Sequence, residues 1–320
     1  MSTTTTDETS LTKKDFVTPN DVRWCPGCGD YAILNAVQRT LPELGIPREQ
    51  FVVVSGIGCS SRFPYYMNSY GFHTIHGRAP TVATGVKVAN PDLSVWMITG
   101  DGDGLSIGAN HLLHLLRRNL DINVLLFNNR IYGLTKGQYS PTSEVGKVTK
   151  ATPYGSIDIP LNPPSLALGA QSTFVARTID RWQKHLSAMM ERSYQHDGGS
   201  FLEIYQNCNI FNDGAFEEYT GKEKLDNVIE LENGKPMLFA RETKGIKLEG
   251  SKAIVVSMDD HSAEDLLVHD ETDLDMAHII ANWTSNPHLP EPIGVIYCVD
   301  KPTYNQDMVD QINSAKEKKG

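Results

Sequence analysis

The chain has 320 residues, of which 40% are hydrophobic, and its formal net charge at pH 7 is -10. That length and apolar content suffice for one large domain, or for one domain with an appendage. The negative charge disfavours a nucleic-acid partner, and no apolar run approaches the roughly 20 residues of a membrane-spanning helix. Because no secretory signal pattern is present either, we expect a cytoplasmic protein whose five cysteines stay reduced.

Taken in chain order, residues 1–20 are rich in Thr, Ser, Asp and Lys and predict a flexible arm. Short runs rich in Val, Ile and Leu then predict strands that are buried on both faces, and helical patterns lie between them. This alternation is typical of a doubly wound, mainly parallel α/β sheet. The expected strands are 51–54, 94–99, 122–127, 173–176 and 201–205, and the expected helices are 80–89, 106–118 and 179–196.

A long segment from residue 130 to about residue 164 is dense in Gly, Pro, Ser, Thr and Lys. It is too long for a plain connector and predicts a functional loop. After residue 215 the pattern weakens, with one helix-like stretch at 274–283 and no catalytic motif. We therefore expect a flexible arm, a cofactor-binding domain at 21–215 and an irregular C-terminal extension at 216–320, whose role the sequence leaves open.

Glycines and carboxylates alternate at 100–104, directly after one strand and before a helix, where the backbone can approach an anion. A dinucleotide site shares such glycines, but two carboxylates would repel a pyrophosphate unless a divalent cation lay between them. Asn129 follows the next strand, 28 positions after Asp101 (129 − 101), so both side chains and the carbonyl of Ile131 can share one Mg²⁺. The alternative is that Asp101 caps a helix and Asn129 forms a turn. The pattern resembles the thiamine-diphosphate signature.

Four cysteines lie in a tight turn or just after predicted strands, namely Cys25, Cys28, Cys59 and Cys208. Their thiolates suit a structural zinc or an iron–sulfur cluster, whereas a redox-active pair would leave two of them unexplained. Proximity to a carbanion-forming cofactor favours iron, because a cluster can accept its electrons. Cys298 lies within an apolar run and is interpreted as a buried strand thiol.

Five segments (24–30, 56–61, 76–79, 100–104 and 127–133) together closely resemble the β subunit of 2-oxoacid:ferredoxin oxidoreductases, over about residues 20–215. The resemblance implies thiamine diphosphate, Mg²⁺ and a 4Fe-4S cluster held by the four cysteines. Proline often follows the last of these cysteines in the family, where this chain has Asn209. The implied cofactor-binding positions are Ile57, Gly58, Cys59, Ser60, His76, Gly100, Asp101, Gly102, Asp103, Asn129, Ile131, Gly133 and Leu134, with Asp101, Asn129 and Ile131 on Mg²⁺.

The resemblance also implies a reaction, in which a 2-oxoacid and coenzyme A give an acyl-CoA and CO2 while electrons pass to ferredoxin, or the reverse carboxylation. The pyrimidine-binding domain belongs to a partner α subunit, so we expect this chain to be inactive alone and to act in a dimer of αβ heterodimers. Sequence leaves open the direction of the reaction, the ferredoxin and the stoichiometry.

Arg62 resembles the family position that meets the distal part of the substrate, and a guanidinium suits the second carboxylate of 2-oxoglutarate. Leu134 is expected to pack on the same end of the substrate. In the alternative, Arg62 pairs with a structural carboxylate or with the partner. The alternative functions are a pyruvate or broad 2-oxoacid:ferredoxin oxidoreductase and a non-oxidative thiamine-dependent decarboxylase.

Overall fold

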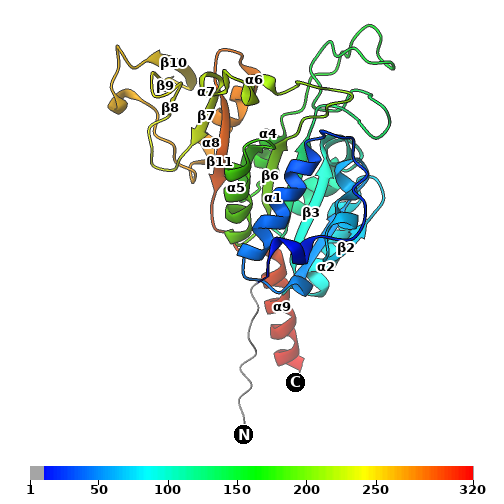
Figure 1. Cartoon of the computed structure of the whole chain (residues 1–320). Helices are drawn as coiled ribbons and strands as arrows, with labels where there is room; N and C mark the ends of the chain where they lie inside the picture. Colours follow the sequence, from blue (N-terminus) through cyan, green and yellow to red (C-terminus); the bar gives the residue numbers. More distant parts are fainter. Residues whose placement is uncertain (1–10, 320) are drawn as a thin grey trace.

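The computed structural model describes residues 11–319 and centres on an eight-stranded sheet (Figure 1). The strands lie in the order β2-β1-β3-β4-β6-β5-β11-β7, and all neighbours are parallel except β5 and β11. The mainly parallel α/β fold class is thereby confirmed. The strands are β1 (Phe51–Ser55), β2 (Tyr70–His73), β3 (Ser94–Gly100), β4 (Asn123–Asn128), β5 (Phe174–Ile179), β6 (Ser200–Tyr205), β7 (Val228–Leu231) and β11 (Glu291–Cys298).

The five central strands form where the Val-, Ile- and Leu-rich runs predicted them, because helices cover both faces of the sheet. Every residue of β1, β4, β5 and β6 is buried. The helix predicted from residue 179 is wrong at its start, since β5 continues to Ile179 and α5 begins only at Gln183.

Two layers of helices flank the sheet. On one face of the sheet, α1 (Asp30–Glu43) and α5 (Gln183–Gln195) cover buried strand residues such as Val53 and Leu125. The alternate residues, such as Val52 and Val124, point to the opposite face, as the two-residue period of a strand requires. That face is covered by α2 (Ala79–Ala89), α3 (Ala109–Arg117), α4 (Pro163–Gly169) and α8 (Leu274–Ala281).

Part of the expected N-terminal arm is folded. Residues 1–10 lie outside the described residues, but Lys13–Phe16 form a short 3-10 helix. The ring of Phe16 is fully buried and contacts that of Phe51 with centroids 5.4 Å apart. The expectation of a flexible arm is therefore wrong for this turn, because Phe16 supplies an apolar anchor that offsets the entropy of ordering.

The residues after 215 contribute to the same sheet as the preceding ones. β11 inserts antiparallel to β5 and β7 pairs parallel to β11, so this part of the chain extends the main sheet. A second sheet is antiparallel, with strands β8 (Leu238–Phe239), β9 (Lys244–Glu249) and β10 (Lys252–Ser257). The remaining helices are α6 (Glu217–Thr220), α7 (Lys224–Asn227) and α9 (Tyr304–Lys319), and Figure 1 shows α9 projecting from the end of the molecule. None of the helices within residues 11–319 is long and apolar enough to cross a bilayer.

Candidate functional site

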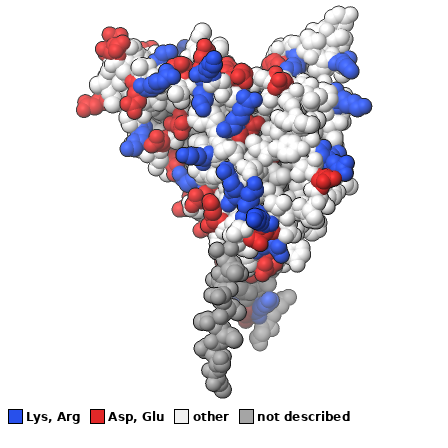
Figure 2. All heavy atoms as spheres, in the orientation of Figure 1, with Lys and Arg blue, Asp and Glu red and all other residues white. Residues whose placement is uncertain are grey.

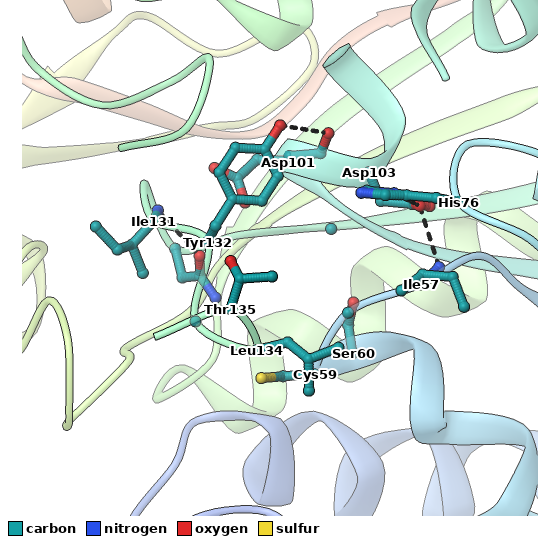
Figure 3. A pocket seen from close by; sticks show the side chains of 15 residues that line it. Ile57, Cys59, Ser60, His76, Asp101, Asp103, Ile131, Tyr132, Leu134 and Thr135 are labelled. Carbon is teal, nitrogen blue, oxygen red and sulfur yellow. Dashed lines mark hydrogen bonds and ion pairs between the residues drawn. The ribbon is translucent and has the colours of Figure 1, made fainter. Parts of the chain in front are cut away.

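A pocket lies where β1, β3 and β4 end (Figure 3). These strands are neighbours and parallel, so the loops that follow them meet at one edge of the sheet. Every cofactor position expected from the sequence lines this pocket. Two lining residues, Tyr132 and Thr135, were not among the expected positions, although both lie in the long segment after residue 130 that was predicted to be functional. The complete lining is Ile57, Gly58, Cys59, Ser60, His76, Gly100, Asp101, Gly102, Asp103, Asn129, Ile131, Tyr132, Gly133, Leu134 and Thr135.

Asp101 follows β3 and is only 2% exposed. The hydroxyls of Ser140 and Thr142 donate to its Oδ2 atom at 2.5 and 2.7 Å. Burial raises the pKa of the Asp101 carboxyl, and these two hydrogen bonds oppose that rise. Within the described part of the chain no Lys, Arg or His forms an ion pair with it. A buried carboxylate without a cationic side chain is well suited to a bound metal ion.

Asp103, the second carboxylate of the loop, is fully engaged by the protein. Its Oδ1 atom accepts hydrogen bonds from the backbone N–H of Ile57 at 3.0 Å and of Gly77 at 2.8 Å, and lies 2.8 Å from Nδ1 of His76. The carboxylate also fills the space where a Cβ at residue 56 would lie, 1.9 Å from Oδ2, so this position requires glycine. Asp103 thus fixes the loops after β1 and after β2 against the loop after β3.

Asn129 follows β4, and its amide oxygen accepts the backbone N–H of Ile131 at 3.2 Å. Its amide nitrogen donates to Gln206 at 2.8 Å. Next along the chain, the hydroxyl of Tyr132 donates to the carbonyl of Gly102 at 3.1 Å, and the Tyr132 ring lies so close that a Cβ at residue 102 would be 2.1 Å away. Figure 3 shows this ring lying over Asp101. The turn after β4 therefore packs directly on the glycine-rich loop.

These oxygen groups fit Mg²⁺ and a diphosphate. Mg²⁺ prefers carboxylate, amide and carbonyl oxygens, and Asp101, Asn129 and Ile131 bring one of each to the same pocket. At the end of β3, Gly100 leaves room for an anionic ligand close to the backbone, whereas the space beside Gly102 is taken by the Tyr132 ring. The chemistry of the donors therefore agrees with the metal site expected from the sequence.

Hydrogen bonds join the loops that carry the four expected cluster cysteines. The indole of Trp24 donates to the carbonyl of Cys59 at 2.6 Å, and Asn209 donates to the carbonyl of Pro26 at 2.7 Å. The side chain of Gln206 lies 3.4 Å from the sulfur of Cys28. The turn at 24–29, the loop after β1 and the loop after β6 are therefore held together, and they are called the cysteine unit.

The thiols of this unit lie close enough to affect one another. A Cβ at residue 133 would lie 3.5 Å from the sulfur of Cys59 and 3.6 Å from that of Cys208, so Gly133, which lines the pocket, lies beside both thiols. Burial, followed by the charges of Asp30, Cys208 and Cys25, raises the pKa of Cys59 to about 12. The pKa of Cys28 is also raised, mainly by burial.

Within residues 11–319, no three His, Cys, Asp or Glu side chains are grouped so as to hold a metal ion. A 4Fe-4S cluster distributes its four cysteine ligands over different iron atoms, so its thiolates are more widely spaced than those around a single ion. The loops after β1 and β6 bring the thiols of Cys59 and Cys208 to one place beside Gly133.

Cys298 stands apart from the other cysteines. It is half-buried at the end of β11, where it pairs with Phe174 at the start of β5. Cys208 follows the carboxyl end of β6, which is parallel to β5. The two cysteines therefore lie at opposite ends of these strands. A strand of six residues spans about 20 Å, which is too far for both thiols to bind one cluster.

Arg62 does not line the cofactor pocket but a separate depression, together with Arg23 and His73, among others. One guanidinium nitrogen is 3.5 Å from the carbonyl oxygen of Arg23. No carboxylate of residues 11–319 pairs with it, which argues against a structural ion pair. Leu134 lines the pocket itself and is 44% exposed at the tip of the turn after β4.

Comparisons with known proteins agree with this arrangement. Residues 56–204 match the family described as thiamine pyrophosphate enzyme, C-terminal TPP binding domain. The chain is 50% identical to 2-oxoglutarate oxidoreductase subunit KorB of Mycobacterium tuberculosis, over 95% of this chain and 82% of that protein. It is 46% identical to 2-oxoacid:ferredoxin oxidoreductase 1, subunit beta, of Aeropyrum pernix, over 66% of this chain and 65% of that protein.

A solved structure is similar over almost the whole chain. It is 2-oxoglutarate:ferredoxin oxidoreductase from Magnetococcus marinus with 2-oxoglutarate, coenzyme A and succinyl-CoA bound. The TM-score is 0.79 at 35% identity, and the match covers 96% of this chain and 92% of that chain. On the strength of the matching sequence and fold, this chain belongs to the family of 2-oxoacid:ferredoxin oxidoreductase β subunits.

Proposed function

We propose that this chain is the thiamine-diphosphate-binding β subunit of a 2-oxoglutarate:ferredoxin oxidoreductase. The enzyme converts 2-oxoglutarate and coenzyme A to succinyl-CoA and CO2 with transfer of electrons to ferredoxin, or runs in the opposite direction. The observation that carries the proposal is the position of the buried carboxylate of Asp101, in one pocket with Cys59 of the cysteine unit. The relatives and the solved structure that carry 2-oxoglutarate in their names support this substrate.

The residues of the pocket have distinct roles in this proposal. Asp101, Asn129 and the carbonyl of Ile131 hold Mg²⁺, and the glycine-rich loop holds the diphosphate. Asp103 holds the loop after β1 through the backbone N–H of Ile57 and the loop after β2 through His76. When bound, thiamine diphosphate supplies the carbon nucleophile and electron sink that decarboxylation of a 2-oxoacid needs.

Cys25, Cys28, Cys59 and Cys208 are proposed to hold a 4Fe-4S cluster, which supplies one-electron redox chemistry. The hydrogen bonds between their loops support a shared site. Gly133 lines the pocket and lies beside the thiols of Cys59 and Cys208, so the cofactor and the cluster would be close together. This close approach favours an oxidative enzyme over a simple decarboxylase, which has no use for thiols beside its cofactor.

A partner α subunit that carries the pyrimidine-binding domain is proposed to cover the long loop after β4. Five apolar side chains of this loop are strongly exposed: Val145 (60%), Val148 (66%), Tyr154 (101%), Ile157 (90%) and Ile159 (85%). This loop projects at the upper right of Figure 1, and Figure 2 shows that the surface there is mostly uncharged. Apolar groups gathered in this way mark protein-interaction sites, and the base of the loop contacts Asp101 in the pocket. Ferredoxin as electron acceptor and a dimer of αβ heterodimers complete the proposed complex.

A substrate panel on the complex co-expressed with its α subunit tests the function. We expect viologen reduction that requires 2-oxoglutarate, coenzyme A, thiamine diphosphate and Mg²⁺ together, and no activity from the β subunit alone. Release of CO2 without reduction of the acceptor would instead identify a non-oxidative decarboxylase. A higher kcat/KM for pyruvate would assign the complex to the pyruvate or broad 2-oxoacid class.

Replacement of Arg62 by alanine is expected to lower kcat/KM for 2-oxoglutarate about 10- to 150-fold and to spare pyruvate. That range corresponds to the roughly 1.5–3 kcal/mol of a hydrogen bond to a charged group. Steady-state kinetics on both substrates give the measurement. Arg23→Ala is the matched control, because Arg23 lines the same depression but pairs with Asp21 at 3.5 Å. Equal losses on the two substrates would remove Arg62 as the selector.

A further inference from the structure

The base of the long loop is buried although its outer part is exposed. Ser140, Thr142 and Ser143 are almost inaccessible to solvent, whereas the apolar residues from Val145 onwards are not. The hydroxyl of Ser143 donates to the carbonyl of Arg130 at 2.6 Å and accepts the backbone N–H of Ser140 at 2.8 Å. Ser140 and Thr142 are thereby held with their hydroxyls toward Asp101.

Thr142 occupies a position between two site residues. Its Oγ1 atom lies 2.7 Å from Oδ2 of Asp101 and 2.9 Å from Oδ1 of Asn128. A threonine hydroxyl carries one proton, and a carboxylate oxygen is a stronger acceptor than an amide oxygen. The Thr142 proton is therefore directed to Asp101, and this bond joins the loop to the end of β3.

Asn128 is itself fixed from behind. Its amide nitrogen donates to Glu203 at 2.7 Å, and its amide oxygen accepts the backbone N–H of Arg130 at 3.2 Å, so the amide has only one orientation that satisfies both neighbours. Glu203 is fully buried and accepts a hydrogen bond at 2.7 Å from Nε of Arg177, which is also fully buried. A continuous series of contacts thus runs from a buried ion pair to the carboxylate in the pocket.

We propose that Thr142, together with Ser140, is a positioning residue that orients the carboxylate of Asp101 for Mg²⁺. The inference rests on the proposed function, because it assumes that Asp101 binds the metal. Groups that hydrogen-bond to a metal ligand orient it, and their loss typically reduces metal affinity 10- to 100-fold. The same two hydroxyls anchor the long loop that is proposed to contact the α subunit. They therefore join this loop directly to the Asp101 carboxylate.

The test uses Thr142→Val in the co-expressed complex, since valine keeps the shape of threonine and removes its hydroxyl. We expect the Mg²⁺ concentration for half-maximal retention of thiamine diphosphate, measured by equilibrium dialysis, to rise about 10- to 100-fold. The kcat at saturating Mg²⁺ and cofactor should stay close to that of the wild type. Thr142→Ser should restore the wild-type Mg²⁺ dependence, because serine returns the donor.

Thr152→Val is the matched control, because Thr152 belongs to the same loop and, among residues 11–319, its hydroxyl hydrogen-bonds only with Thr149 and Lys147. Ser140→Ala removes the other donor to Asp101 and is expected to shift the Mg²⁺ requirement in the same direction. It decides the question if the valine variant does not fold. A purely structural role would instead lower thermal stability or kcat and leave the Mg²⁺ dependence unchanged, which would overturn the inference.

The wild-type titration separates failure of the inference from failure of the proposed function. If the wild-type complex retains no thiamine diphosphate at any Mg²⁺ concentration, the proposed function is wrong and the inference falls with it. If the wild type needs Mg²⁺ and both Thr142→Val and Ser140→Ala match it, only the positioning role is wrong.

Discussion

Replacement of Asp101 by asparagine is expected to leave the complex without thiamine diphosphate and without 2-oxoacid oxidation. The change keeps the size of the side chain but removes the carboxylate charge that Mg²⁺ needs in a buried pocket. A metal contact is worth several kcal/mol, and each 1.4 kcal/mol is a factor of ten, so cofactor affinity should fall about 1,000-fold or more. The measurement is the thiamine diphosphate content of the purified complex after desalting.

Asn129→Ala should act in the same direction, because it removes the amide oxygen that lines the same pocket. Asp158→Asn provides the control for Asp101. Asp158 is an exposed acid of the long loop after β4, and its carboxylate accepts a hydrogen bond from the hydroxyl of Tyr139 at 2.7 Å. It should retain the cofactor. An Asp101→Asn complex that binds thiamine diphosphate with the wild-type Mg²⁺ dependence would place the metal elsewhere.

Loss of Cys59 or Cys208 is expected to remove the iron and the acid-labile sulfide of the complex almost completely. Both thiols adjoin Gly133, so each would face the same cluster next to the cofactor pocket. Electron transfer to a viologen should be lost with the iron, because a cofactor-bound electron pair has no other one-electron acceptor in the proposed site. Metal analysis of anaerobically purified Cys59→Ala and Cys208→Ala complexes gives the measurement.

Cys298→Ala is the matched control for these variants. Its thiol lies at the other end of the strands from Cys208, 3.9 Å from Nδ1 of His196. The iron content of this variant should therefore equal that of the wild type. Loss of iron from this variant would show that the proposed set of ligands is wrong. Zinc in place of iron in the wild-type complex would support the structural-zinc alternative.

The composition of the strands alone determined the fold class. Val-, Ile- and Leu-rich runs without polar alternation have one stable environment, a sheet covered on both faces, and β1, β3, β4, β5 and β6 form at those runs. The pocket followed from the same reasoning. Parallel neighbouring strands end at one edge, so Asp101 and Asn129, which directly follow two of them, had to come together there.

Helix α1 was not among the predicted helices, although its buried positions Ile33, Leu34, Val37 and Leu41 have the spacing of an amphipathic helix. Phe16 shows a different limit. A single apolar residue in a polar segment says nothing about burial until the surface that receives it, including Phe51, has formed.

Only the tertiary structure decided which side chains support the site. Thr142 meets Asp101 across 41 positions, and Arg177 is bound by Glu203 and, 114 positions away, by Glu291. It also placed Arg62 in a depression separate from the cofactor pocket, and it inserted β11 antiparallel to β5. Local patterns report on the periodicity of neighbouring residues, and they carry no information about contacts that exist only once distant segments have packed. The sequence therefore determined the sheet and the residues at its strand ends, while the hydrogen bonds that hold those residues in place depend on how the chain closes on itself.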